Sequence, residues 1–227
     1  MRFLCKATVA LAALASATAA SATVVDPTAD FLSTYTGPLN GDIDILSGDV
    51  AFDGTSYFLT STQNGTIGST AGSIFVWGIN RGQGAPRLTF GSPSVGAGVL
   101  FDAVVVMFPD GTLRVVTIPS AGPPTINVIA GGTSVAGGTL SSIIPLALLG
   151  STGFLPGDYT FSLWSRARVN PAADGSNAEI ADFLPNSGSI QARVVPEPAT
   201  WLTMLLGFGL VGGLLRSSKV RVRRLGA

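Results

Sequence analysis

Short apolar runs separated by turn-forming residues fill the middle of the chain. The runs are three to eleven residues long and are bounded mainly by Gly, Pro, Asn or Asp, which favours strands over helices. They lie at 43–46, 50–52, 57–60, 74–79, 99–108, 113–118, 125–130, 140–149 and 159–169. Between them, Asp53-Gly54 and Pro109-Asp110-Gly111-Thr112 are typical of hairpin turns. The pattern predicts nine or ten strands, with a single helical turn at 178–184.

Many short strands without a long helix indicate an all-β domain. We expect an antiparallel β-sandwich, jelly-roll-like, over residues 23–194. A body of this length can bury one good core without disulfides or metals. No repeat of fixed period is present, which disfavours a solenoid.

The two ends of the chain differ from the middle. Residues 1–22 read as a signal peptide, with Arg2 and Lys6 before an apolar run and Ala-x-Ala sites after it. Near the other end, 17 residues at 199–215 carry no charge. As a helix they would span roughly 25 Å, the short end of a membrane crossing. The alternative is a buried core helix, but the many glycines and the basic end favour a single transmembrane helix.

A basic cluster follows this apolar segment within 216–224. Its members are Arg216, Lys219, Arg221, Arg223 and Arg224. Basic residues beside a membrane span stay on the cytoplasmic side. The signal peptide places the N-terminus on the same side. The body is therefore expected outside the inner membrane, on the periplasmic side.

The formal net charge of zero hides an acidic body. Between Thr23 and Val195 there are six arginines, no lysine and twelve acids, a net charge of −6. An acidic, lysine-free surface argues against nucleic acid as a partner.

The body contains neither Cys nor His. This composition excludes disulfides, thiolate or imidazole metal sites, and any triad that needs histidine. Glycoside hydrolysis needs two carboxylates across a cleft. Glu179 is the body's only glutamate, and most aspartates stand in turns. We therefore predict that the protein is no enzyme, and a secreted carbohydrate-active enzyme with a carboxylate pair remains the alternative.

The one cofactor that the residues suggest is Ca²⁺. Asp42-Ile43-Asp44 begins like a calcium loop, but Leu46 and Ser47 replace the ligand and glycine that an EF-hand needs. A looser site can use Asp42, Asp44, Asp49 or Asp53 with backbone carbonyls. The alternative is that these acids are solvated turn residues.

Aromatic side chains suggest glycan contact. Sandwich folds commonly offer aromatic rings to sugar faces, and Trp77 and Trp164, with Tyr57 and Tyr159, are the candidates. The alternative is that both tryptophans, which lie in predicted strands, are core anchors.

The C-terminal segment 195–227 resembles a known sorting signal. Val195-Pro196-Glu197-Pro198 and Trp201, followed by a glycine-rich span and the basic cluster, resemble the PEP-CTERM signal in its PEPxxWA form. Similar tails are also labelled ice-binding-protein C-terminal domains. Leu202 departs from that form, which has Ala there. The resemblance implies export, processing by an exosortase-type membrane enzyme, and delivery to the exopolysaccharide-rich surface or biofilm matrix of a Gram-negative bacterium.

These features together predict an exported envelope or matrix protein. Its body is expected to be a structural module or one that binds exopolysaccharide. Ice binding or adhesion is a further alternative, although ice binding would need a regular threonine array that the sequence does not display.

Overall fold

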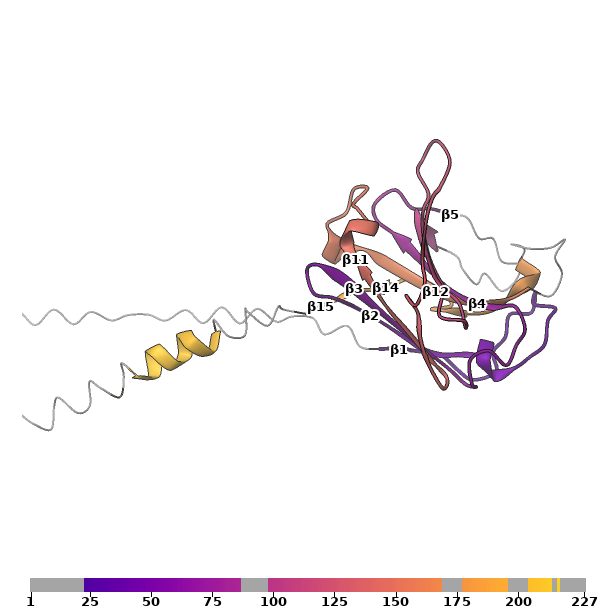
Figure 1. The fold of residues 1–227 in the computed structure, drawn as a ribbon, viewed down its shortest axis with the longest axis horizontal. Helices are drawn as coiled ribbons and strands as arrows, with labels where there is room; N and C mark the ends of the chain where they lie inside the picture. The colour runs from indigo at the N-terminus through magenta and orange to yellow at the C-terminus, as the bar shows by residue number, and fades with distance from the viewer. Residues whose placement is uncertain (1–22, 87–97, 169–176, 196–203, 214–215, 217–227) are drawn as a thin grey trace, which may run out of the picture.

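The computed structural model describes residues 23–86, 98–168, 177–195, 204–213 and 216. Within them the chain is mostly β-strand, arranged in two large sheets and one two-stranded sheet (Figure 1). All strand pairs are antiparallel except one. The predicted all-β, antiparallel character is therefore confirmed for this part of the chain, whereas the predicted signal peptide at 1–22 lies outside the described residues.

Sheet A has six strands, which come from both ends and the middle of the body. They are β1 (Val24–Val25), β2 (Ile45–Phe52), β3 (Ser56–Gln63), β10 (Ser134–Ala136), β11 (Thr139–Pro145) and β15 (Arg193–Val194). The order is β1-β2-β3-β11-β10, and β15 also pairs with β2. Because β3 occupies one edge of β2, β1 and β15 share the other: β1 pairs antiparallel at residues 47–48 and β15 parallel at 51–52.

Sheet B has seven strands, in the order β13-β12-β4-β7-β8-β9, with β14 also paired to β12. They are β4 (Ser73–Asn80), β7 (Ala103–Met107), β8 (Leu113–Thr117), β9 (Thr125–Ile129), β12 (Thr160–Ala167), β13 (Ile180–Leu184) and β14 (Ile190–Gln191). The small sheet pairs β5 (Ala85–Pro86) with β6 (Leu100–Phe101). Single 3-10 turns are η1 (Gly41–Ile43), η2 (Leu146–Leu148), η3 (Pro156–Asp158) and η5 (Asn177–Glu179).

The inner faces of sheets A and B share one hydrophobic core. Strand β3 alternates buried and half-exposed positions, so that Tyr57 and Leu59 point inward. They join Trp77 and Phe161 of sheet B in one cluster of buried side chains. The ring centroids of Tyr57 and Phe161 are 5.4 Å apart, a favourable aromatic contact. This shared core holds the two sheets together.

A second cluster lies on the other face of sheet B. Trp164 stacks on Phe183 at 5.7 Å between ring centroids and also contacts Phe101. Leu32 and Tyr35, from the segment after β1, belong to the same cluster. Strands β12 and β13 are therefore buried on both faces over most of their length.

Several predicted element bounds need correction. The runs 43–46 and 50–52 are parts of η1 and the single strand β2, whereas 99–108 is divided into β6 and β7. The division falls at Asp102, which belongs to neither strand. Its buried carboxylate accepts hydrogen bonds from the backbone and the guanidinium of Arg81. Residues 140–149 end in η2, and 178–184 form η5 and then strand β13. The two predicted hairpin turns are confirmed, with Gly54 and Gly111 at positive φ.

The tail is described only in part. Residues 204–213 are helical and exposed. In the ranges that the structure describes, no helix has both the length and the apolar character needed to cross a membrane. The predicted span at 199–215 lies partly outside those ranges.

Candidate functional site

The outer face of sheet A carries an array of small hydroxyl side chains. Strand register places Ser47, Thr62 and Thr139 in one cross-strand row, and Thr60 and Ser141 in the next row beside Asp49. Side chains that are directly opposite across strands share a face at about 5 Å. We call the array of Ser47, Thr60, Thr62, Thr139 and Ser141 the hydroxyl face. No single strand shows the array, because it forms only when β2, β3 and β11 pair.

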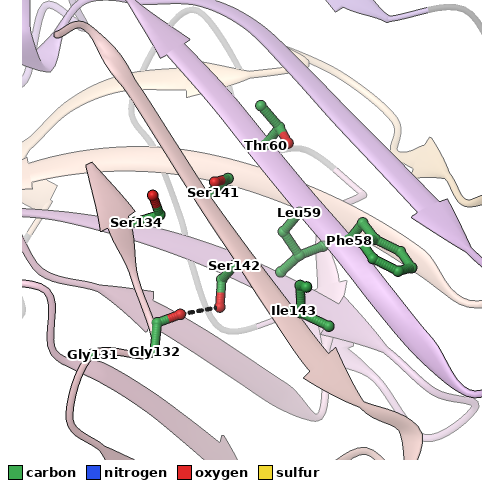
Figure 2. A pocket seen from close by; sticks show the side chains of 9 residues that line it. All are labelled: Phe58, Leu59, Thr60, Gly131, Gly132, Ser134, Ser141, Ser142 and Ile143. Carbon is green, nitrogen blue, oxygen red and sulfur yellow. Dashed lines mark hydrogen bonds between the residues drawn. The ribbon is translucent and has the colours of Figure 1, made fainter. Parts of the chain in front are cut away.

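A groove of about 460 Å³ adjoins the hydroxyl face. It is lined by Phe58, Leu59, Thr60, Gly131, Gly132, Ser134, Ser141, Ser142 and Ile143 (Figure 2). The Ser142 hydroxyl donates to the Gly132 carbonyl at 2.6 Å and so holds the turn between β9 and β10 against β11.

The groove combines an apolar wall with hydroxyl groups. Phe58 and Ile143 are directly opposite across β3 and β11, and Ile143 is 59% exposed. Thr60, Ser134 and Ser141 supply hydroxyls that can donate and accept. None of the nine lining residues titrates near neutral pH. Such a lining suits a neutral polyol and offers no acid or base of its own.

The aromatic residues that the sequence suggested for glycan contact are all in the interior. Trp77 is fully buried and Trp164 is 4% exposed, and Tyr57 and Tyr159 are fully buried. The tyrosine hydroxyls donate to the backbone carbonyls of Pro156 and Leu149. Their positions fit the core-anchor alternative, because no ring face is open to a sugar.

The aromatic side chain at the groove is Phe58, which the sequence analysis did not single out. The alternation of buried and half-exposed residues along β3 could have indicated that Phe58 faces outward. Phe58, Thr60 and Thr62 occupy the positions opposite in parity to buried Tyr57 and Leu59. The alternation alone could not show that β11 would add Ser141 and Ile143 to the same face.

The acids predicted to hold calcium do not form one cluster. Asp42 accepts hydrogen bonds from the backbone and hydroxyl of Thr70. Asp44 accepts from the backbone N–H of Ala29, and Asp49 pairs with Arg193. Each of these carboxylates is engaged in a structural contact, and calcium binding by them stays a prediction.

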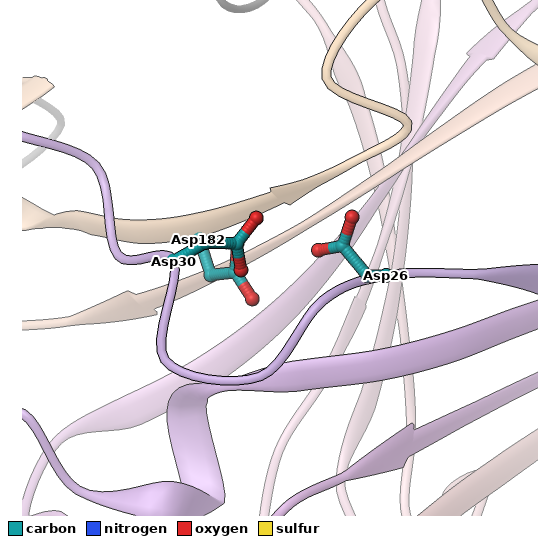
Figure 3. A group of neighbouring side chains, drawn as sticks. All are labelled: Asp26, Asp30 and Asp182. Atoms are coloured by element: carbon teal, nitrogen blue, oxygen red, sulfur yellow. The ribbon is translucent and has the colours of Figure 1, made fainter.

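Asp26, Asp30 and Asp182 are the acids that come together. One carboxylate oxygen from each lies within 4.8 Å of the others (Figure 3). Asp26 Oδ2 and Asp30 Oδ1 are buried without a hydrogen-bond partner, while Asp182 accepts from the backbone N–H of Ile45 at 2.6 Å. Clustered carboxylate oxygens are the ligands that Ca²⁺ prefers. This arrangement can hold a hard cation.

The electrostatics of the three-acid cluster differ from those of surface acids. Burial, together with the nearby charges of Asp30 and Asp44, raises the pKa of Asp26 to about 7. Burial also raises the pKa of Asp182 to about 8, with added repulsion from Asp26 and Asp30. Either protons or a cation must therefore offset the crowding of negative charge near neutral pH.

The body's only glutamate serves an interior contact. Glu179 is fully buried, and its Oε2 lies 2.7 Å from Nη2 of Arg166. Asp102 is likewise buried in an ion pair with Arg81. Neither carboxylate faces the groove.

The sorting residues are only partly described. The backbone N–H of Val195 donates to the Phe52 carbonyl at 2.7 Å, which continues the pairing of β15 with β2. Arg216 is exposed. The other predicted residues of the motif and basic cluster lie outside the described ranges: Pro196, Glu197, Pro198, Trp201, Lys219, Arg221, Arg223 and Arg224.

Comparison with known proteins addresses the tail. No curated protein and no solved structure matches this chain. A family model does match, over residues 194–221, and its description is the PEP-CTERM protein-sorting motif. The predicted sorting signal is thereby confirmed: this chain carries a PEP-CTERM protein-sorting motif, the signal of an exported protein that an exosortase processes.

Proposed function

We propose that the protein is an envelope or matrix component whose body binds neutral exopolysaccharide through the groove of sheet A. In this proposal, the precursor is held at the inner membrane by its tail, with the body on the periplasmic side. Exosortase processing then delivers it to the surface or matrix of a Gram-negative bacterium. The two sheets packed on one core serve as a jelly-roll-like sandwich that displays the groove.

The observation that carries the proposal is the composition of the groove. Phe58 and Ile143 offer apolar surface of the kind that packs against the C–H faces of a sugar ring, beside the hydroxyls of Thr60 and Ser141. Neutral hydroxyl partners and the absence of titratable groups among the nine lining residues favour an uncharged glycan over a uronate. A uronate would need a cation to offset its desolvation.

The same lining argues against the enzyme alternative at this groove. A glycosidase of the common type needs two carboxyl groups about 5–10 Å apart, and no carboxylate lines this groove.

The hydroxyl face gives some support to the ice-binding alternative, since Thr60, Thr62 and Thr139 share one surface. Phe58 and Ile143 form the next row and limit that array to two rows, so we rank glycan binding first.

Affinity electrophoresis through gels that contain neutral or acidic polysaccharides tests the proposal. We expect the exported protein to be retarded by a neutral polysaccharide, and Phe58→Ala to lose about tenfold in affinity. The matched control is Phe154→Ala, because Phe154 is also partly exposed, at 39%, but does not line the groove. Retardation that is equal in both variants would refute a role for the groove, and an ice-recrystallisation assay on the same samples separates the ice-binding alternative.

A further inference from the structure

Strand β9 (Thr125–Ile129) forms an open edge of sheet B. Within the described residues it pairs only with β8. Ile126 and Val128 are each 61% exposed, although aliphatic side chains in a strand are usually covered. Natural edge strands are commonly protected by a charge, a proline or a bulge. The five residues Thr-Ile-Asn-Val-Ile contain none of these.

The sequence of β9 is self-complementary about Asn127. If two copies of the strand pair antiparallel with Asn127 opposite Asn127, then Ile126 of each copy faces Val128 of the other. Thr125 likewise faces Ile129. This register uses all five strand residues, whereas a shift in either direction leaves residues unpaired or brings Pro124 into the ladder. Pro123 and Pro124 on one side and Gly131 and Gly132 on the other thus limit the pairing to this register.

The charge distribution allows two copies to meet at the β9 edge. The body is acidic overall, so two copies repel each other through most of their surfaces. The β9 edge is uncharged, and its cross-strand neighbours on β8 are Val116 beside Ile126 and Arg114 beside Val128. In the paired arrangement each Arg114 is separated from its symmetry mate by the aliphatic side chains of both β9 strands. No like charges are placed opposite one another.

We propose that β9 is a homotypic docking edge, through which two copies of this protein join their seven-stranded sheets into one continuous sheet. The joined surface is small compared with the ~800 Å² per partner of a standard interface. The contact is therefore weak and operates when the protein is concentrated, as on a cell surface or in a matrix. The proposal is independent of glycan binding, because β9 does not line the groove.

Register-specific disulfide trapping tests this edge. Cys5 is the chain's only cysteine, so the full chain with Cys5→Ser and Asn127→Cys carries a single thiol. In the proposed register the two Cβ atoms at position 127 lie about 5 Å apart, close to disulfide geometry. Position 125 is the matched control, because its two copies would be roughly 13 Å apart along the strands. After mild oxidation of exporting cells, we expect a disulfide-linked dimer with Asn127→Cys and only a trace with Thr125→Cys.

A charge placed on the edge supplies a second control. Adding Ile126→Lys to the Asn127→Cys chain should lower the dimer yield several-fold, while Leu155→Lys, at a position that is 72% exposed outside β9, should leave it unchanged. Both lysines are added at exposed sites, so folding is preserved. The proposal is overturned if Asn127→Cys gives no dimer, if Thr125→Cys gives as much, or if Ile126→Lys has no effect.

Discussion

Arg193 Nη2 lies 3.2 Å from Asp49 Oδ2 and joins the last strand of the body to β2. The connection continues along the backbone for two more residues. Val194 pairs in parallel with Phe52, and the backbone N–H of Val195 donates to the Phe52 carbonyl. The sorting motif begins at residue 194. The base of the sorting tail is thus part of sheet A, on the edge that β1 also occupies.

The Arg193–Asp49 pair should contribute little to stability. Its side chains are 38% and 26% exposed, and solvent screens such pairs. We expect Arg193→Ala to lower the free energy of unfolding by less than about 1 kcal/mol. Urea unfolding of the exported protein measures this value, and a loss of several kcal/mol would contradict it.

Arg81 should behave in the opposite way. Its guanidinium contacts the Asp102 carboxylate at 3.0 Å and the Gly150 carbonyl at 2.8 Å, and both ion-pair partners are almost fully buried. Removing one partner leaves a buried charge without compensation. We expect Arg81→Ala to cost about 3–5 kcal/mol in the same unfolding assay. A cost as small as that of Arg193→Ala would show that Asp102 can be solvated or protonated without penalty.

Gly78 should not tolerate a side chain. A Cβ at this position would lie 2.8 Å from a ring carbon of Trp164, which is held between Phe101 and Phe183. We expect Gly78→Ala to lower stability by about 1–3 kcal/mol through overpacking. Gly150→Ala is a suitable comparison because nothing lies within 4 Å of its Cβ. Equal thermal midpoints for the two variants would contradict the packing argument.

Removing a core aromatic residue should affect stability, whereas removing the groove aromatic residue should affect polysaccharide affinity. Trp164→Ala removes a buried side chain and should cost about 3–5 kcal/mol of stability, but the protein that remains folded should keep its polysaccharide affinity. Phe58→Ala should do the reverse, with a large loss of retention and a small loss of stability. Unfolding curves and affinity electrophoresis on the same two variants measure both quantities. If folded Trp164→Ala loses retention by the polysaccharide gel, then glycan binding depends on Trp164, and this prediction is wrong.

Stability should fall as the pH rises through neutrality. The pKa of Asp26 is raised to about 7 and that of Asp182 to about 8, both from 3.8. The folded state therefore holds protons that the unfolded chain has released between about pH 4 and 8. It follows that the free energy of unfolding decreases across this window. Urea midpoints at pH 5 and pH 8 in a chelating buffer measure the effect.

Two variants and added calcium test whether the three-acid cluster causes this pH dependence of stability. Asp26→Asn removes one of the titrating groups and should flatten the profile between pH 5 and 8. Asp53→Asn should not, because hydrogen bonds from Thr55 and Ser56 lower the pKa of Asp53 and place its effect in more acidic solution. Stability that stays level or rises from pH 5 to 8 would refute the assignment. Stabilisation by millimolar Ca²⁺ at pH 8, lost in Asp26→Asn, would identify the three-acid cluster as a cation site.

Local chemistry determined a large part of this protein. Gly54 and Gly111 end strands because their turns need positive φ, and the sequence predicts both hairpins. The sorting motif is also a local feature, since Val195-Pro196-Glu197-Pro198 and Trp201 are contiguous or nearly so. Short apolar runs predict strands because a strand is formed by neighbouring residues with a period of two.

Only the tertiary structure decided which side chains meet. Asp26 and Asp182 are 156 positions apart, and they approach because the segment after β1 folds over sheet B beside β13. Phe58 meets Ile143 because β3 pairs with β11 across the chain. The sequence offered Trp77 and Trp164 either as sugar contacts or as core anchors, and the packing of the sheets placed both inside. Strand pairing and burial depend on residues far apart in the chain, whereas turns and sorting motifs depend on neighbours.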